Sequence, residues 1–280
     1  MKISIIGVGL IGGSLALSLR RTGFASYIIG VDNNEEHCTE ALSLNLIDEV
    51  LPLEEAVNQS DLVILSIPID KAKVVLGKIL DNVAEDTVVV DMGSTKNGIC
   101  TLNRYHPKRR QYVASHPIAG TEYSGPKAAI DNLFDGKKTI ICERELSSGF
   151  ALQRTIDMYK SLNMDIIYMN PEIHDRHIAF VSHISHISSF ALSLTVLNIE
   201  KDERTIFDMA GSGFSSTARL AKSSAETWAP IFMQNAESVS YALGNYIEML
   251  QHFKNSIDNK DAGELKKLML EANNIKRIIK

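Results

Sequence analysis

Three closely spaced glycines near the start of the chain restrict its fold more than any other feature. Residues 3–7 form a short strand-like run, and Gly7, Gly9 and Gly12 follow with the spacing Gly-x-Gly-x-x-Gly, where a helix is expected to begin. In such a unit the first glycine permits a tight turn, the second lets a pyrophosphate approach the backbone, and the third allows close packing of helix and strand. This context predicts a dinucleotide site with the phosphates at the helix N-terminus.

An acidic residue closes the second predicted strand. Asp32 follows residues 27–31 and lies 20 residues beyond Gly12, a position that suits hydrogen bonds to the ribose on the adenine side. A carboxylate there repels a 2′-phosphate, and residues 33–36 contain no arginine, so NAD is favoured over NADP. The plainer alternative is a glycine turn that only tightens the junction between strand and helix. The residues expected to contact NAD are Gly7, Gly9, Leu10, Ile11, Gly12, Asp32, Ser66 and Pro68.

Short β-branched runs alternate with helical patterns along the first part of the chain. The strand candidates are residues 3–7, 27–31, 61–66, 87–91, 112–115, 139–142 and 165–168. This alternation is typical of βαβ units and a buried parallel sheet. Residues 172–197 then lack proline and glycine, which predicts one long helix, and most of the remaining chain is also predicted to be helical. We predict an α/β fold: a Rossmann-type, doubly wound, mostly parallel sheet at residues 1–168, followed by an all-α domain at residues 169–280.

Charge and composition limit the classes of function. The chain of 280 residues has a net charge of -5 and an isoelectric point near 5.9, so we expect no nucleic-acid partner. Three scattered cysteines without a Cys-x-x-Cys pair suit a reducing compartment. The N-terminus lacks a signal-peptide pattern, and no run of about 20 apolar residues is free of polar groups. A cytoplasmic protein without a membrane segment is therefore expected.

Polar segments end two later predicted strands, at residues 91–96 and 115–122. Open α/β sheets bind their ligands at the carboxyl ends of the strands, so both segments should lie near the nicotinamide. A histidine there can take a proton from a hydroxyl group while the adjacent carbon gives up hydride. We therefore predict His116 as a catalytic base, with a histidine that only hydrogen-bonds a turn as the alternative.

The predicted long helix carries a polar stripe. Four residues share one face at positions i, i+4, i+7 and i+11: Asp175, Ala179, Ser182 and His186. Because dry burial of unpaired polar groups is costly, the stripe is expected to face a wet cleft between the domains, with His183 beside it. A hydrogen-bonded helix interface is one alternative. A metal site at His174 and His177 is another, but no HExxH pattern accompanies them and we expect no metal.

Arg219 follows a stretch of glycines and hydroxyl residues that begins at Gly211. In a chain without general positive charge, such an arginine suits bidentate binding of a substrate carboxylate. A surface charge or an ion pair between helices is the alternative.

In their order along the chain, these motifs resemble those of the prephenate and arogenate dehydrogenases of tyrosine biosynthesis. The series reads GVGLIGGS, DMGSTK, SHPIAGTE, HDRHIAFVSHISH and GFSSTARLA, with Trp228 beyond. The resemblance implies an NAD-dependent oxidative decarboxylation of a small-molecule substrate. Prephenate would give 4-hydroxyphenylpyruvate, and arogenate, the alternative substrate, would give tyrosine. The resemblance also implies a homodimer formed through the helical domain.

The resemblance further implies roles for individual residues. His116 corresponds to the catalytic histidine at the ring hydroxyl, and Ser94 to a serine near that hydroxyl and the nicotinamide. Arg219 corresponds to the arginine that binds a substrate carboxylate, and Asp175 to part of the ionic network that orients it. The other substrate-side residues are His183 with Ser182 near cofactor and substrate, His186 as a donor toward the pyruvyl side chain, Glu122 as a guard of the pocket, and Thr121.

The chain departs from the family pattern at a few positions. An Arg-Asp pair is common where this chain has Ser215 and Ser216, which removes charge near Arg219. Prolines are common where the chain has Ser185 and Ala225. None of these changes touches His116.

Other hypotheses fit fewer of the motifs. A different two-domain reductase would not need HPIAG followed by SHxxH, and an NAD-binding sensor would have no use for a base beside the nicotinamide. A Ser-His-Asp hydrolase built from Ser182, His186 and Asp175 would need a GxSxG elbow, which the chain lacks.

Overall fold

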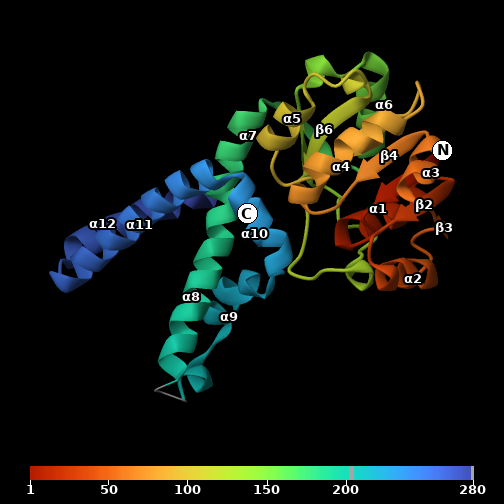
Figure 1. Cartoon of the computed structure of the whole chain (residues 1–280). Helices are drawn as coiled ribbons and strands as arrows, with labels where there is room; N and C mark the ends of the chain where they lie inside the picture. The colour runs from red at the N-terminus through yellow and green to blue at the C-terminus, as the bar shows by residue number, and fades with distance from the viewer. Residues whose placement is uncertain (202–204, 279–280) are drawn as a thin grey trace.

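The computed structural model describes residues 1–201 and 205–278, in which an α/β part is followed by a helical part (Figure 1). The strands are β1 (Lys2–Ile6), β2 (Tyr27–Val31), β3 (Glu49–Val50), β4 (Leu62–Leu65), β5 (Val88–Asp91), β6 (Tyr112–Pro117), β7 (Lys138–Cys142) and β8 (Asp165–Met169). The α-helices between them are α1 (Leu10–Arg21), α2 (Glu35–Ser43), α3 (Leu53–Asn58), α4 (Ile69–Asn82), α5 (Asn97–Asn103) and α6 (Gly149–Ser161).

The eight strands form one sheet in the order β3-β2-β1-β4-β5-β6-β7-β8. Neighbouring strands are parallel except for β6 and β7, so the predicted doubly wound, mostly parallel fold is confirmed. The strand order reverses between β1 and β4, and open α/β sheets bind ligands at the carboxyl ends of the strands beside such a point. The edge strand β3 is absent from the predicted set, because two residues give no periodic pattern.

Helices cover both faces of this sheet. On one face α1 and α6 bury Leu19 and Met158, and on the other α4 and α5 bury Leu76 and Ile99. Strands β4 and β5 are buried along their whole length, which explains their continuous apolar sequence. The sheet is therefore a rigid base for the polar residues at its carboxyl edge.

The helical part begins directly after β8. Its helices are α7 (Pro171–Ile178), a π-helical segment (Ala179–His183), α8 (Ile184–Glu200), α9 (Ser212–Ala218), α10 (Ala225–Gln234), α11 (Ala236–Asp258) and α12 (Ala262–Ala272). From α7 to α8 the chain runs on as one helix over residues 171–200, which confirms the predicted long helix and adds a π turn within it. Such turns are frequent at functional sites. In Figure 1, α8 with α9 and α11 with α12 leave the α/β part as two diverging arms.

The long helix exposes much of its apolar surface. Residues 171–200 have the length and composition of a membrane span, yet only 11% of their most apolar window is buried. This feature was not expected, because histidines and serines interrupt the apolar run. Leu194 and Leu197 remain 61% and 47% exposed, so the described part of the chain leaves them uncovered.

Candidate active site

The glycine turn has the geometry that a dinucleotide requires. Gly7 adopts a φ of 96°, and a Cβ on Gly12 would lie 2.0 Å from the Gly7 carbonyl oxygen, so the turn and the start of α1 are in close contact. A Cβ on Gly9, in contrast, would meet nothing within 4 Å. The first turn of α1, with Leu10 and Ile11, receives no side-chain cap from the described residues, which leaves its N–H groups to bind an anion.

Asp32 lies beside this turn at the carboxyl end of β2. Its carboxylate accepts hydrogen bonds from the N–H groups of Val8 (3.1 Å) and Asn34 (3.0 Å), which fix its orientation. Ser66 supports the turn from behind, since its hydroxyl oxygen lies 2.8 Å from the Gly7 carbonyl oxygen. Pro68 is exposed at the start of α4. The open backbone at Gly9, the free N–H groups of α1 and the carboxylate of Asp32 together fit NAD.

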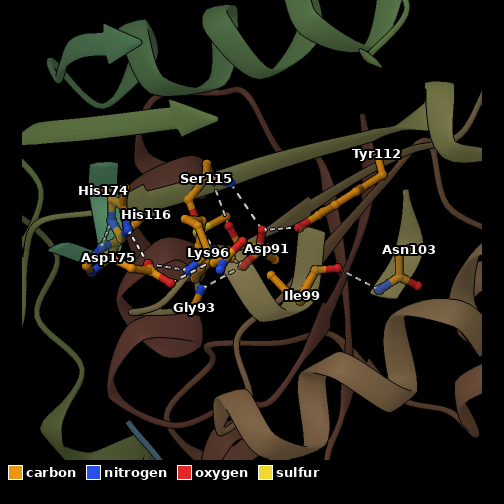
Figure 2. A network of polar contacts seen from close by, with 12 residues as sticks. Asp91, Gly93, Lys96, Ile99, Asn103, Tyr112, Ser115, His116, His174 and Asp175 are labelled. Atoms are coloured by element: carbon orange, nitrogen blue, oxygen red, sulfur yellow. Dashed lines mark hydrogen bonds and ion pairs between the residues drawn. The ribbon is translucent and has the colours of Figure 1, made fainter. Parts of the chain in front are cut away.

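His116 lies on β6 and is held by residues of the helical part. Its Nδ1 is 2.9 Å from Nε2 of His174 on α7, and Nδ1 of His174 is 2.7 Å from the carboxylate of Asp175. The same carboxylate accepts backbone N–H bonds from Lys96 (2.7 Å) and Asn97 (2.9 Å) at the start of α5. Figure 2 shows the two rings and the carboxylate side by side.

The surroundings of His116 keep its ring neutral. Burial is the main cause, and the nearby His174, Lys96 and His183 add to it, so the pKa of His116 is lowered well below its ordinary value. A neutral imidazole can accept a proton at neutral pH, as a base for a hydroxyl group must.

A buried ion pair lies next to His116 in the same network (Figure 2). Lys96 and Asp91 are both completely buried and paired with each other, and Nζ of Lys96 also donates to the carbonyl oxygen of Ser115 (2.6 Å). The hydroxyl of Tyr112 donates to the second carboxylate oxygen of Asp91 (2.7 Å). Because both charges are compensated, the pair can remain in a dry interior and fix the loop after β5.

His183 has a ring nitrogen that is unpaired among the described residues and contacts the same network through Asn235. The side-chain amide of Asn235 donates to the carbonyl oxygen of Asp175 (2.6 Å) and lies 3.3 Å from Nδ1 of His183. Burial lowers the pKa of His183 to about 4, so the ring is neutral and accepts at Nδ1. The proton is then on Nε2, which is buried without a partner in the described part of the chain. Such a donor is suited to an acceptor on a ligand.

His186 stacks on Trp228, with ring centroids 3.4 Å apart and 25° between the planes. Its Nδ1 donates to the carbonyl oxygen of Ser182 (3.1 Å). Burial lowers the pKa of His186, the bond to Ser182 opposes this shift and Arg219 reinforces it. The neutral ring therefore presents an acceptor at Nε2 and not the donor that the resemblance implied.

Arg219 connects the helical part to the segment after β6. It begins a short 3-10 helix (Arg219–Lys222), and its guanidinium donates to Glu122 over 2.7 Å. The expected link between Arg219 and Asp175 is wrong, because the Asp175 carboxylate is buried and bound to His174 and to the start of α5. The pKa of Glu122 is lowered, first by a hydrogen bond from its own backbone N–H and then by Arg219.

The remaining predicted residues lie on the same segments. Ser94, Thr121 and Ser182 are partly exposed, and the hydroxyl of Thr121 accepts the N–H of Tyr123 (3.2 Å). His177 is exposed whereas His174 is buried, so the two do not share a ligand set. Within residues 1–201 and 205–278, no group of three or more His, Cys, Asp or Glu is placed to hold a metal ion.

Several residues join the site without having been predicted to do so. Asp91 and Lys96 lie in the polar segment at the end of β5, so their position was a usable signal. His174 was considered only as a metal ligand, and Trp228 only as part of the resemblance. Asn235 gave no signal, since it lies between two helical stretches and acts through a partner 60 residues away.

A separate hollow of about 630 Å³ lies at the amino ends of β4 and β5, lined by residues that include Asp61, Asp86 and Arg154. It opens at the opposite edge of the sheet from the glycine turn. It therefore does not belong to the dinucleotide site.

Comparisons with known proteins agree with this geometry. A model of the prephenate dehydrogenase nucleotide-binding domain matches residues 15–168, and a model of the prephenate dehydrogenase dimerization domain matches residues 170–271. Prephenate dehydrogenase of Bacillus subtilis is 28% identical over 94% of this chain and 72% of its own length. Cyclohexadienyl dehydrogenase of Zymomonas mobilis is 29% identical over 94% of this chain and 90% of its own length.

Solved structures show the same relationship. Prephenate dehydrogenase from Aquifex aeolicus, in complex with hydroxyphenyl propionate and NAD+, has a TM-score of 0.88 at 34% identity and covers 99% of this chain and 97% of its own. Arogenate dehydrogenase of Synechocystis has a TM-score of 0.74 at 26% identity over 99% of both chains. The fold and the site define an NAD-dependent dehydrogenase with a helical second domain. Since both family models match, the chain belongs to the prephenate dehydrogenase family.

Proposed function

We propose that the chain oxidises prephenate with NAD and releases carbon dioxide, giving 4-hydroxyphenylpyruvate. The observation that carries this proposal is His116, a buried and neutral base at the same edge of the sheet as the glycine turn. The substrate is supported by relatives named prephenate dehydrogenase at 28% and 34% identity.

Each side chain of the site has a separate role in this reaction. The glycine turn and Asp32 would hold NAD, which would supply the acceptor for a hydride from the ring carbon that bears the hydroxyl. His116 takes the hydroxyl proton and Ser94 orients the hydroxyl, while Arg219 binds a substrate carboxylate. Loss of the ring carboxylate as carbon dioxide leaves its electron pair to aromatise the ring. The phenolate that results regains the proton from His116.

Arogenate is a second candidate substrate, and one observation favours it. Nε2 of neutral His186 offers a lone pair, because Nδ1 donates to Ser182. A lone pair suits the ammonium group of arogenate, whereas the keto group of prephenate needs a donor.

The substrate assignment is tested by adding prephenate and arogenate separately to the full chain with NAD. We expect NADH and a phenolic product to form with prephenate. Turnover with arogenate but not with prephenate would show that arogenate is the substrate. Absence of NADH with both compounds would reject the proposed function.

We also propose that the protein is a cytoplasmic homodimer. The match to the dimerization domain and the uncovered apolar surface of the arms support the dimer. Three cysteines without a disulfide, two of them buried, suit a reducing compartment.

A further inference from the structure

A chain of hydrogen bonds joins His116, His174 and Asp175 across the boundary between the two parts of the protein (Figure 2). The three residues are 8%, 2% and 4% exposed, so water does not compete for these bonds. The ring planes of the two histidines meet at 70° with centroids 5.1 Å apart, an edge-on arrangement that allows one nitrogen to face the other.

The proton positions follow from the acidic end of this chain. A carboxylate offers only lone pairs, so Nδ1 of His174 donates to Asp175. In a neutral ring Nε2 of His174 then carries a lone pair, and Nδ1 of His116 must donate to it. The lone pair of His116 is left on Nε2, which has no hydrogen-bond partner among the described residues.

We propose that His174 is a positioning residue: anchored on Asp175, it holds His116 in the tautomer whose Nε2 accepts the substrate proton. This inference deepens the proposed function and rests on it for the identity of the proton donor. An imidazole without a fixed partner exchanges between its two tautomers, and only one of them has a lone pair at Nε2. In Ser-His-Asp triads the aspartate has the same task of fixing the tautomer.

Asp175 is the carboxylate at the end of the hydrogen-bond chain that begins at His116. The charge of Lys96 is compensated by Asp91, and His183 is neutral because burial lowers its pKa to about 4. The Asp175 carboxylate also accepts the backbone N–H groups of Lys96 and Asn97, which hold it in place as the anchor of His174.

The direct test is nuclear magnetic resonance of the full chain labelled with ¹⁵N in its histidines, recorded at neutral pH without substrate. We expect His116 to be neutral, and both His116 and His174 to carry a proton on Nδ1. The signals are assigned by their loss in His116→Asn and His174→Gln. A proton on Nε2 of His116, or a doubly protonated His174, would overturn the inference.

Kinetics of matched variants provide a second test. His174→Leu removes the acceptor, so kcat should fall about 100-fold while KM changes by less than about threefold. His174→Gln retains an acceptor for Nδ1 of His116 and should recover part of the lost rate. His177→Leu, an exposed histidine on the same helix, should leave kcat unchanged.

The outcomes separate this inference from the proposed function. Unaltered kcat in His174→Leu, or an equal loss in His177→Leu, would refute the positioning role. If wild-type protein forms NADH with neither substrate but shows both protons on Nδ1, the proposed function fails while the tautomer assignment stands.

Discussion

Burial decides what each histidine of the site can do at neutral pH. It lowers the pKa of His116 and His186, and it brings that of His183 to about 4. All three rings are therefore neutral, and their hydrogen-bond partners determine which nitrogen donates. The site consequently offers a lone pair on His116 for the proposed base, a donor on His183 and an acceptor on His186.

Replacing His116 with Asn should separate catalysis from binding. The amide keeps a polar side chain of similar size but cannot take up a proton, so kcat should fall by a factor of about 100 or more with little change in KM. Arg219→Ala should instead raise KM, because the lost contact binds the substrate before and during the reaction. Steady-state kinetics with the preferred substrate distinguish the two. Full activity in His116→Asn would show that another group is the base.

The pH should change the relative use of the two substrates through His186. Its pKa is lowered, mainly by burial, so the ring is neutral at pH 7 and becomes a donor at Nε2 only as the pH falls. The ratio of kcat/KM for prephenate to that for arogenate should therefore rise as the pH is lowered below about 6.5, the ordinary pKa of histidine. Protonation of His116 affects both substrates and cancels in the ratio. A ratio that stays constant in wild type, or one that still varies in His186→Leu, would contradict this role.

At the residue scale, position at a strand end was enough to place His116 at the carboxyl edge of the sheet, because parallel strands deliver their carboxyl ends to one edge. Its partner His174 was not predicted, since the two are 58 residues apart and no local pattern encodes their contact. The contact of Arg219 with Glu122 was not predicted either, since these two residues are 97 positions apart.

Among the elements, the glycine turn allows a matched pair of substitutions. Gly12→Ala would place a Cβ 2.0 Å from the Gly7 carbonyl oxygen, so the protein should lose about 1–3 kcal/mol of stability. Gly9→Ala meets nothing within 4 Å and should cost less than about 1 kcal/mol. The same methyl group would occupy the space of the pyrophosphate, so the affinity of Gly9→Ala for NAD should fall at least about tenfold, or 1.4 kcal/mol. Thermal unfolding and NAD titration check both variants, and tight NAD binding by Gly9→Ala would place the phosphates elsewhere.

Elements with a strong period were predictable and those without one were not. The buried strands and the long helix follow from continuous apolar runs and helical spacing. The antiparallel pairing of β7 with β6 was not predicted. It arises because the segment between these two strands contains no α-helix that would carry the chain back to the other end of the sheet. The π turn at Ala179–His183 lies beside the contact of Asn235 with the Asp175 carbonyl oxygen, and sequence periodicity reports neither feature.

For the whole molecule, the exposed apolar stripe of α11 predicts where copies of the chain meet. Ile247, Leu250 and Ile257 share one face and are 55%, 50% and 60% exposed. Leu250→Arg combined with Ile257→Arg should raise the dimer dissociation constant at least about 100-fold, which sedimentation velocity measures. Val74→Arg, at a residue 62% exposed on α4, is the control and should remain dimeric. An intact dimer in the double variant would place the interface on another surface.

Because α7 is bonded to β6 and α5, the proposed catalysis would require both halves of the chain. His174 and Asp175 belong to the helical half and supply the hydrogen-bond partner of His116. The α/β half therefore carries the proposed base but not the residues that would fix its tautomer. A movement that parted the two halves would break the hydrogen bond between His116 and His174. The proposed reaction therefore requires that the α/β half and the helical half of the chain remain in contact.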